Sequence, residues 1–243
     1  MNIENLPITS NTIKYHKFWI LYPFILMFSV APSIFIASNF FQYFYPVFNN
    51  ISLIVILPLL LLGYYLLFDL TLLLIVKLFL ILLKLIHQPK EGLFNIDLQD
   101  KDYLFFCLRK SLKNLLFKLY NYFPLPWIRI FALKLCNIKT PNSVGLLDSY
   151  IDTDFIEFGE DSILGEGTMV MSSIIIGDQL LIKKVKLEVG CTVGAYSLIA
   201  PGTTVGKGSI LGGRSYTSIG QHLESGWVYV GRPAKKLEQL QIE

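Results

Sequence analysis

The stretch VGAYSLIAPGTTVGKGSILGG, residues 193–213, carries an apolar residue at every sixth position. The same six-residue spacing of apolar residues continues upstream and is interrupted by one shift in phase. A small residue follows most of these positions, and a serine or threonine often stands four residues after them. A short fixed period of this kind is typical of a β-solenoid, in which each hexad supplies one short strand with its apolar residue inward. The slots are Phe158, Leu164, Val170, Ile176, Ile182, Leu187, Val193, Ile199, Val205 and Leu211, followed by Thr217.

The two runs of hexads are separated at IKKVKLE, residues 182–188, where we expect an outward loop or a strand extension. We interpret the recurrent glycines as the residues that allow tight turns between the faces of a prism, because glycine adopts conformations barred to other residues. Residues of about 156–230 are predicted to form a three-sided β-helix of roughly three to four coils, with about 18 residues in each coil.

The N-terminal part has a different composition. No Asp, Glu, Lys or Arg occurs between Phe18 and Phe68, although charged residues make up 16% of the chain. Two apolar stretches, at about 18–44 and 51–76, are each long enough to cross a bilayer, since roughly 20 apolar residues suffice. The first stretch is too long for a signal peptide and lacks a cleavage pattern, so we expect a retained anchor. Asp69 is either functional, as intramembrane carboxylates often are, or a wet side chain near the interface.

The lysine distribution predicts the orientation of this hairpin. Lys14 and Lys17 precede the first apolar stretch, and Lys77, Lys84 and Lys90 follow the second. The turn between the two stretches has no basic residue. Basic residues are enriched on the cytoplasmic side of membrane proteins. We therefore expect an integral membrane protein with two spans, both ends in the cytoplasm and a cytoplasmic β-helix.

A connector joins the hairpin to the repeats. Residues 91–102 read as a linker or short strand, and Tyr103 to Tyr122 and Trp127 to Leu135 read as amphipathic helices. The first helix lies on the anionic inner leaflet, packs against the β-helix, or does both with different faces. One of its faces is basic. That face carries Arg109, Lys110, Lys113 and Lys118. We divide the chain into a membrane hairpin (1–90), a helical connector (91–140) and a β-helix with a C-terminal tail (141–243).

Composition narrows the classes of partner. A net charge of +3 without a Lys/Arg run gives no support to nucleic-acid binding, whereas the apolar hairpin predicts the lipid bilayer as a partner. The three cysteines (Cys107, Cys136, Cys191) lack the spacing of a metal site. Their odd number is simplest to interpret as reduced thiols in a cytosol-facing region.

Three motifs resemble the left-handed β-helix, hexapeptide-repeat acyltransferase superfamily: LGEGTM (164–169), the stretch 193–213 and GWVYVGRPAKKL (226–237). The hairpin together with FPLPWIRIFALKLCNIK (123–139) is similar to the membrane-embedded C-terminal regions of polylysine-type peptide synthetases. The resemblance implies a membrane α-helical hairpin followed by a left-handed parallel β-helix built of hexapeptide repeats.

The resemblance also implies a homotrimer, with acyl-CoA as co-substrate in the groove between neighbouring prisms and without a metal. The positions that match this groove are Gly194, Ala195, Gly212 and Gly213, with Arg214 and Lys235 placed to meet the CoA phosphates. The same glycines would also serve simply to turn corners, as in any solenoid.

The family uses a histidine as general base, within hydrogen-bond reach of the acceptor. Ser173 occupies the matching position here, and a serine hydroxyl without an adjacent base cannot take that proton. His222 is the only histidine among the repeats and is a weak catalytic candidate; one histidine also cannot build the three-histidine zinc site of gamma carbonic anhydrases. The acidic residues that could substitute as base are Asp148, Asp152, Asp154 and Glu166.

Three interpretations therefore stay open. The first is a membrane-bound acyltransferase that acts on an acceptor at the cytoplasmic leaflet. The second is a catalytically silent relative that binds a partner and acts as a membrane scaffold. The third is a transport-linked module in which helices from three subunits form a path. The serine at position 173 favours the second interpretation.

Overall fold

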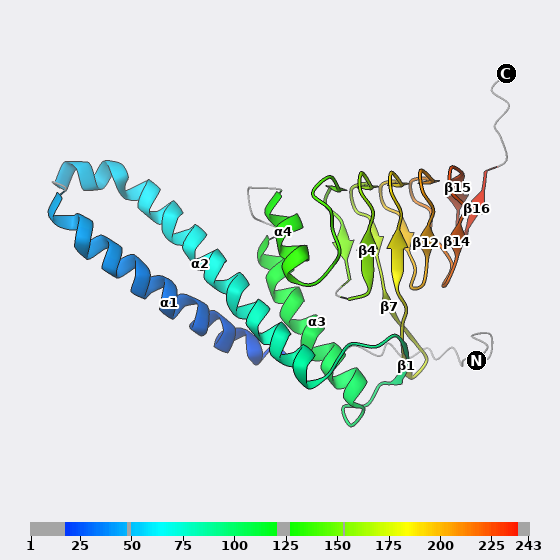
Figure 1. The fold of residues 1–243 in the computed structure, drawn as a ribbon, viewed down its shortest axis with the longest axis horizontal. Helices are drawn as coiled ribbons and strands as arrows, with labels where there is room; N and C mark the ends of the chain where they lie inside the picture. Colours follow the sequence, from blue (N-terminus) through cyan, green and yellow to red (C-terminus); the bar gives the residue numbers. More distant parts are fainter. Residues whose placement is uncertain (1–17, 48–49, 121–126, 153, 238–243) are drawn as a thin grey trace, which may run out of the picture.

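Short parallel strands repeat along the C-terminal half of the chain (Figure 1). The computed structural model describes residues 18–47, 50–120, 127–152 and 154–237. Thr192 pairs with Ile210 and Ile210 with Val228, so these strands meet the strand 18 residues further on. Thr204 shows the same spacing, since it pairs with Lys186 and with His222. This spacing confirms the predicted three hexads per coil, and the parallel stacking fits a β-helix.

The strands form three stacks. The first sheet contains β2 (Gly145–Leu146), β5 (Ile163–Leu164), β10 (Thr192–Val193), β13 (Ile210–Leu211), β15 (Val228–Gly231) and the antiparallel β16 (Ala234–Lys236). The second sheet contains β3 (Tyr150–Ile151), β6 (Met169–Val170) and β11 (Leu198–Ile199). The third sheet contains β4 (Ile156–Phe158), β9 (Val185–Leu187), β12 (Thr204–Val205) and β14 (His222–Leu223).

The core of the stack is a column of aliphatic side chains. Leu164, Val170, Val193, Ile199 and Val205 are all fully buried, as their slots in the repeat predict. The recurrent hydroxyls are buried too. Ser162, Thr168 and Ser209 donate to the carbonyl oxygen three residues earlier, as Ser162 does to Gly159 (2.9 Å) and Ser209 to Gly206 (2.6 Å). These three hydroxyls thereby satisfy corner carbonyls, whereas Ser197 donates to the Gly212 carbonyl oxygen of the next coil (2.9 Å).

The shift in phase is a hairpin, and the prediction that Ile176 and Ile182 point into the core of the stack is wrong. Strands β7 (Ser173–Ile176) and β8 (Gln179–Ile182) pair antiparallel, and β8 also pairs with β1 (Gly92–Asn95) of the connector. The coil that contains this hairpin is 29 residues long, from Ile163 to its partner Thr192. Residues 185–187, within the predicted interruption, form the regular strand β9.

Two long helices form the N-terminal hairpin: α1 (Leu21–Phe44) and α2 (Asn50–Ile86), joined through a 3-10 turn, η2 (Tyr45–Val47). They lie side by side, and the Thr71 hydroxyl donates a hydrogen bond to the Ser29 carbonyl oxygen (2.9 Å). Both are long and apolar enough to cross a membrane. Helix α2 continues ten residues past the predicted end of its span. Lys14 and Lys17, on which the predicted orientation depends, lie outside the described residues.

The rest of the protein shields the Asp69 side chain from solvent. Its side chain is only 4% exposed, and Tyr65, one turn earlier in α2, hydrogen-bonds to its carboxyl group. Tyr120 of the connector donates a hydrogen bond to the Asp69 carbonyl oxygen (2.9 Å). The interpretation of Asp69 as a wet interfacial side chain is therefore wrong.

Two connector helices, α3 (Lys101–Tyr120) and α4 (Trp127–Leu135), lie between the hairpin and the β-helix (Figure 1). The bounds of α4 confirm the prediction; Asn121 and Tyr122, the expected end of the preceding helix, lie outside the described residues. Lys77 of α2 donates hydrogen bonds to the Leu135 carbonyl oxygen (2.7 Å) and to Asn137 Oδ1 (2.8 Å). These bonds fix α2 to the end of α4 and to the segment that follows it.

The buried column predicts a sharp difference between the two faces of one coil. Ile199→Asp places a carboxylate without a partner in the core and should destabilise the protein by about 4 kcal/mol or more. Thr204→Asp, on the outward side of the next strand, should change stability by less than about 1 kcal/mol. Thermal unfolding of the detergent-solubilised protein measures both. Equal melting of Ile199→Asp and the parent protein would contradict the register.

Candidate functional site

A buried charge cluster joins α3 to the first coil of the β-helix (β2, β3 and β4). The Lys110 ammonium lies 3.2 Å from Asp152 Oδ1 and donates to Ser173 Oγ (3.3 Å). The Ser173 hydroxyl in turn hydrogen-bonds to Asp152, whose carboxylate also accepts from Ser172 (3.5 Å). Asp152 and Ser173 are fully buried. The position that the resemblance assigns to a histidine is thus closed off from solvent and used for an internal contact.

A second set of ion pairs lies beside the first. Lys113 Nζ is 2.7 Å from Asp154 Oδ1, and Arg109 Nε is 3.5 Å from Asp154 Oδ2. Arg109 also donates from Nη1 to the His87 carbonyl oxygen (3.3 Å). Burial lowers the pKa of the Arg109 guanidinium, and the Asp154 carboxylate opposes that shift.

These contacts decide between the two orientations expected for the basic face of α3. Arg109, Lys110 and Lys113 are buried and point toward the carboxylates of the first coil, whereas Lys118 is exposed. The expectation that this face lies on the membrane surface is wrong for the three buried cations. The alternative, packing against the β-helix, is confirmed.

A cavity of about 320 Å³ opens beside these ion pairs, where the end of α2, the segment after it, α3 and the first coil meet; we call it the junction cavity. Its wall combines apolar side chains with an excess of cations over carboxylates. The charged lining residues are Lys84, Glu91, Arg109, Lys113, Lys139, Asp154, Glu157 and Lys184.

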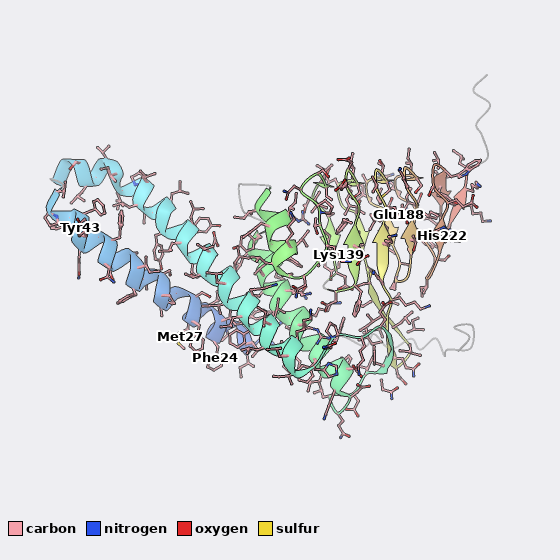
Figure 2. All side chains as sticks on the ribbon, viewed as in Figure 1. Phe24, Met27, Tyr43, Lys139, Glu188 and His222 are labelled. Atoms are coloured by element: carbon pink, nitrogen blue, oxygen red, sulfur yellow. The ribbon has the colours of Figure 1, made fainter. Side chains whose placement is uncertain are left out.

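Glu157 is held as a carboxylate at the rim of this cavity. Lys139 Nζ and Lys184 Nζ lie 2.6 Å and 2.9 Å from its Oε1 atom. The hydrogen bond from Lys139 is the largest of the effects that hold the pKa of Glu157 below its usual range, and Lys184 acts in the same direction. Figure 2 shows Lys139 near the start of the β-helix.

The two catalytic candidates are not brought together. Ser173 is the first residue of β7 and contacts Lys110 of α3. His222 lies on β14, toward the other end of the stack, and its side chain is exposed (Figure 2). Among the described residues, His222 takes part in no ion pair. Ser173 and His222 therefore do not belong to one site.

The residues expected to contact acyl-CoA do share one corner, between the first and second sheets. Gly194 and Ala195 follow β10, and Gly212, Gly213 and Arg214 follow β13 one coil later. A Cβ atom on Gly194 would lie 2.4 Å from the Gly213 backbone nitrogen, so stacking of the coils alone accounts for that glycine. Gly213 and Arg214 are exposed at this corner and could meet an anionic ligand.

Lys235 lies apart from that corner. It belongs to β16, is exposed, and pairs with Val230 at the C-terminal end of the first sheet.

The remaining candidates divide by exposure. Asp152 and Asp154 are committed to ion pairs, whereas Glu166 is exposed and the Asp148 side chain is 85% exposed.

All three cysteines are buried, and they form no disulfide within the described part of the chain. Burial raises the pKa of Cys136 to about 11 and that of Cys191 to about 12, so neither thiol is ionised near neutral pH.

No protein-family model and no curated protein sequence matches the chain. Among solved structures, a hexapeptide-repeat acetyltransferase from Vibrio cholerae overlaps 56% of this chain and 93% of its own, at 15% identity and a TM-score of 0.43. A maltose O-acetyltransferase from Clostridium difficile 630 overlaps 60% of this chain and 92% of its own, at 14% identity and a TM-score of 0.49.

A third similar structure is AntD, an N-acyltransferase from Bacillus cereus in complex with dTDP and 3-hydroxybutyryl-CoA. It overlaps 42% of this chain and 74% of its own, at 22% identity and a TM-score of 0.28. The β-helix of the present chain is supported by its own 18-residue strand registers.

Sequence reasoning missed the partners of Ser173. Lys110 and Lys113 were assigned to the basic face of a helix, and Asp152 and Asp154 were considered only as substitute bases. The available signal was spacing: the two lysines are one turn apart on a helix, and the two aspartates are two residues apart in one segment. That spacing lets two parallel ion pairs form between the same two elements.

The buried cluster predicts unequal costs for removing two aspartates of the first coil. Asp152→Ala leaves the Lys110 ammonium buried without its partner and should cost about 3–5 kcal/mol of stability. Asp148→Ala, a matched exposed change whose carboxylate is 4.0 Å from Arg129, should cost less than about 1 kcal/mol. Chemical unfolding in detergent compares the two variants. A small effect of Asp152→Ala would show that the cluster does not hold α3 in place.

Proposed function

We propose that this chain is a membrane-anchored, acyltransferase-like protein of the hexapeptide-repeat type that acts as a binding or scaffolding subunit at the cytoplasmic leaflet, without acyl transfer of its own. One observation carries the proposal. Ser173, at the position expected for the catalytic base, is fully buried and hydrogen-bonded to the Lys110–Asp152 ion pair. No acceptor hydroxyl or amine can reach this side chain, and serine cannot replace an imidazole as base.

Membrane anchoring is supported by how little of the hairpin the protein itself covers. In the most apolar windows of the two long helices, only 17% and 33% of residues are buried. Large side chains such as Phe24 and Met27 of α1 and Tyr43 near its end project from the hairpin (Figure 2). A patch of this extent on a soluble protein would drive aggregation, whereas in a bilayer it faces acyl chains. We propose that both ends of the hairpin and a left-handed β-helix lie in the cytoplasm.

A trimer is supported by the outward residues of the β-helix. The first sheet exposes Ile163 and Ile210, and the second exposes Tyr150 and Met169. The outward positions of the third sheet are mostly polar or charged. They are Glu157, Lys186, Thr204 and His222. Two adjacent apolar faces on each prism suit a closed ring of three copies, each of which offers one face to each neighbour.

This trimer can be tested by native mass spectrometry in mild detergent, where we expect three copies as the main species. Met169→Lys places a charge on an apolar face and should shift the population at least tenfold toward monomer. Thr204→Lys, on the polar third sheet, should leave the trimer intact. A single copy for the parent protein across detergents and concentrations would rule out the proposed assembly.

A second candidate function is acyl transfer from acyl-CoA, and one arrangement favours it. The exposed carboxylate of Glu166 stands on the same corner as Ala195, because the Tyr196 backbone nitrogen donates to the Glu166 carbonyl oxygen (2.8 Å). In the proposed trimer, this corner between the two apolar faces would line the groove between neighbouring prisms. Glu166 could serve there as an alternative base.

Turnover of acetyl-CoA separates the two functions. With amine and hydroxyl acceptors, the parent protein should release thiol no faster than buffer, and Ser173→Ala should leave that rate unchanged. The alternative predicts turnover at about 1 s⁻¹ or faster, which is in the usual enzymatic range. It also predicts a fall of at least tenfold in Glu166→Gln, with no change in Glu160→Gln, a matched exposed carboxylate on another corner. That pattern would refute the silent subunit.

A further inference from the structure

The junction cavity holds more positive charge than its own carboxylates neutralise. Asp154 and Glu157 are each shared between two cations. Glu91 is the third carboxylate of the wall, and its side chain accepts a hydrogen bond from the Lys184 backbone nitrogen (2.8 Å). Lys84 forms no ion pair among the described residues. Five cations against three carboxylates leave a surplus of two positive charges around the cavity. The wall is therefore suited to an anion.

One buried donor in this wall has only a long ion-pair contact. Arg109 is only 5% exposed, and its Nε atom has no hydrogen-bond acceptor among the described residues. The nearest carboxylate oxygen, Asp154 Oδ2, is 3.5 Å away, beyond an ordinary hydrogen bond, and it is likewise without a donor. The Nε–H group is therefore held only by this long ion pair and can still donate to a closer acceptor. Phosphate oxygens are strong acceptors for a guanidinium group.

The cavity lies beside the exposed apolar surface of α2, and this position indicates which class of molecule carries the anion. Large apolar side chains stay exposed along α2 to its last residue: Leu78 (56%), Leu82 (46%), Leu85 (78%) and Ile86 (71%). Lys84 stands among them and also lines the cavity. A lysine at the end of an apolar helix extends its ammonium group toward lipid headgroups. The cavity therefore opens at the depth where headgroup phosphates lie.

We infer that the junction cavity binds the phosphate of an anionic membrane lipid, with Arg109 and Lys184 donating to its oxygens and Lys84 at the mouth. The inference goes beyond the proposed function and rests on its membrane anchoring. A volume of about 320 Å³ accommodates a phosphate with a small substituent such as glycerol. The acyl chains would follow the apolar side of α2.

Binding can be measured on the full chain in dodecyl maltoside, by native mass spectrometry with dioctanoyl phosphatidylglycerol. Lys84→Gln/Lys184→Gln removes two cations of the cavity and leaves the buried pairs of Asp154 intact. We expect this variant to bind the lipid at least tenfold more weakly. Lys235→Gln/Lys236→Gln removes the same charge from β16, at the C-terminal end of the stack and away from the cavity, and should change the affinity less than twofold.

Two further ligands distinguish the sources of affinity. Dioctanoylglycerol, which has the chains without the phosphate, should bind at least tenfold more weakly than the phospholipid; equal binding would overturn the inference. Inorganic phosphate alone should also bind weakly. Binding as tight as that of the lipid would assign the cavity to a soluble anion and overturn the lipid assignment. An equal loss in both double variants would show a general charge effect and would likewise overturn it.

Carbonate extraction of membranes separates this inference from the function on which it rests. Protein that stays in the membrane pellet but shows no selective lipid binding would refute the cavity site alone. Release of the protein into the supernatant would refute the membrane anchoring as well.

Discussion

Asp152 and Asp154, two carboxylates on one segment of the first coil, hold the helical half of the molecule against the β-helix. They accept contacts from Arg109, Lys110 and Lys113 of α3, and all of these groups are withdrawn from water. A buried charge without a partner costs several kcal/mol, so α3 can take this position only with its cations opposite those two carboxylates. The position of α3 then determines where the end of α2 lies and thereby the shape of the junction cavity.

The repeat could be predicted from the sequence because it follows from requirements within each hexad. Each hexad must place one aliphatic side chain inward and a small residue at the corner, so Val193, Ile199, Val205 and Leu211 mark three successive strands and the return to the first face. Ile176 and Ile182 matched the same period by coincidence. Their hairpin is stabilised by β1, more than 80 residues earlier in the chain, and by contacts with α3. Strand pairing between segments so far apart in the sequence produces no periodic pattern of residues in either segment.

The candidate site was predictable only in part, for a related reason. A basic, amphipathic helix after an apolar stretch has the same composition whether its cations meet lipid phosphates or protein carboxylates. Whether the cations contact lipid or protein depends on whether a pair of carboxylates lies opposite Lys110 and Lys113 in the folded chain. That is decided by tertiary structure. Ser173 was singled out through a family resemblance, but its bond to Asp152 could not be read from spacing. The cavity is likewise assembled from five separate stretches of the chain, and its surplus of cations arises only when these stretches meet.

The two ends of the strand stack differ in what covers them. Helices α3 and α4 lie at the end where β2, β3 and β4 begin the coils, and β16 folds back antiparallel along the last strand of the first sheet (Figure 1). Lys235 and Lys236 on that final strand add charge to an edge that would otherwise offer free backbone groups. Solenoids with open ends can polymerise by stacking one molecule's last coil on another's first. Here α3 and α4 cover one end, and β16 occupies the edge of the first sheet at the other, so axial stacking of coils between copies is disfavoured.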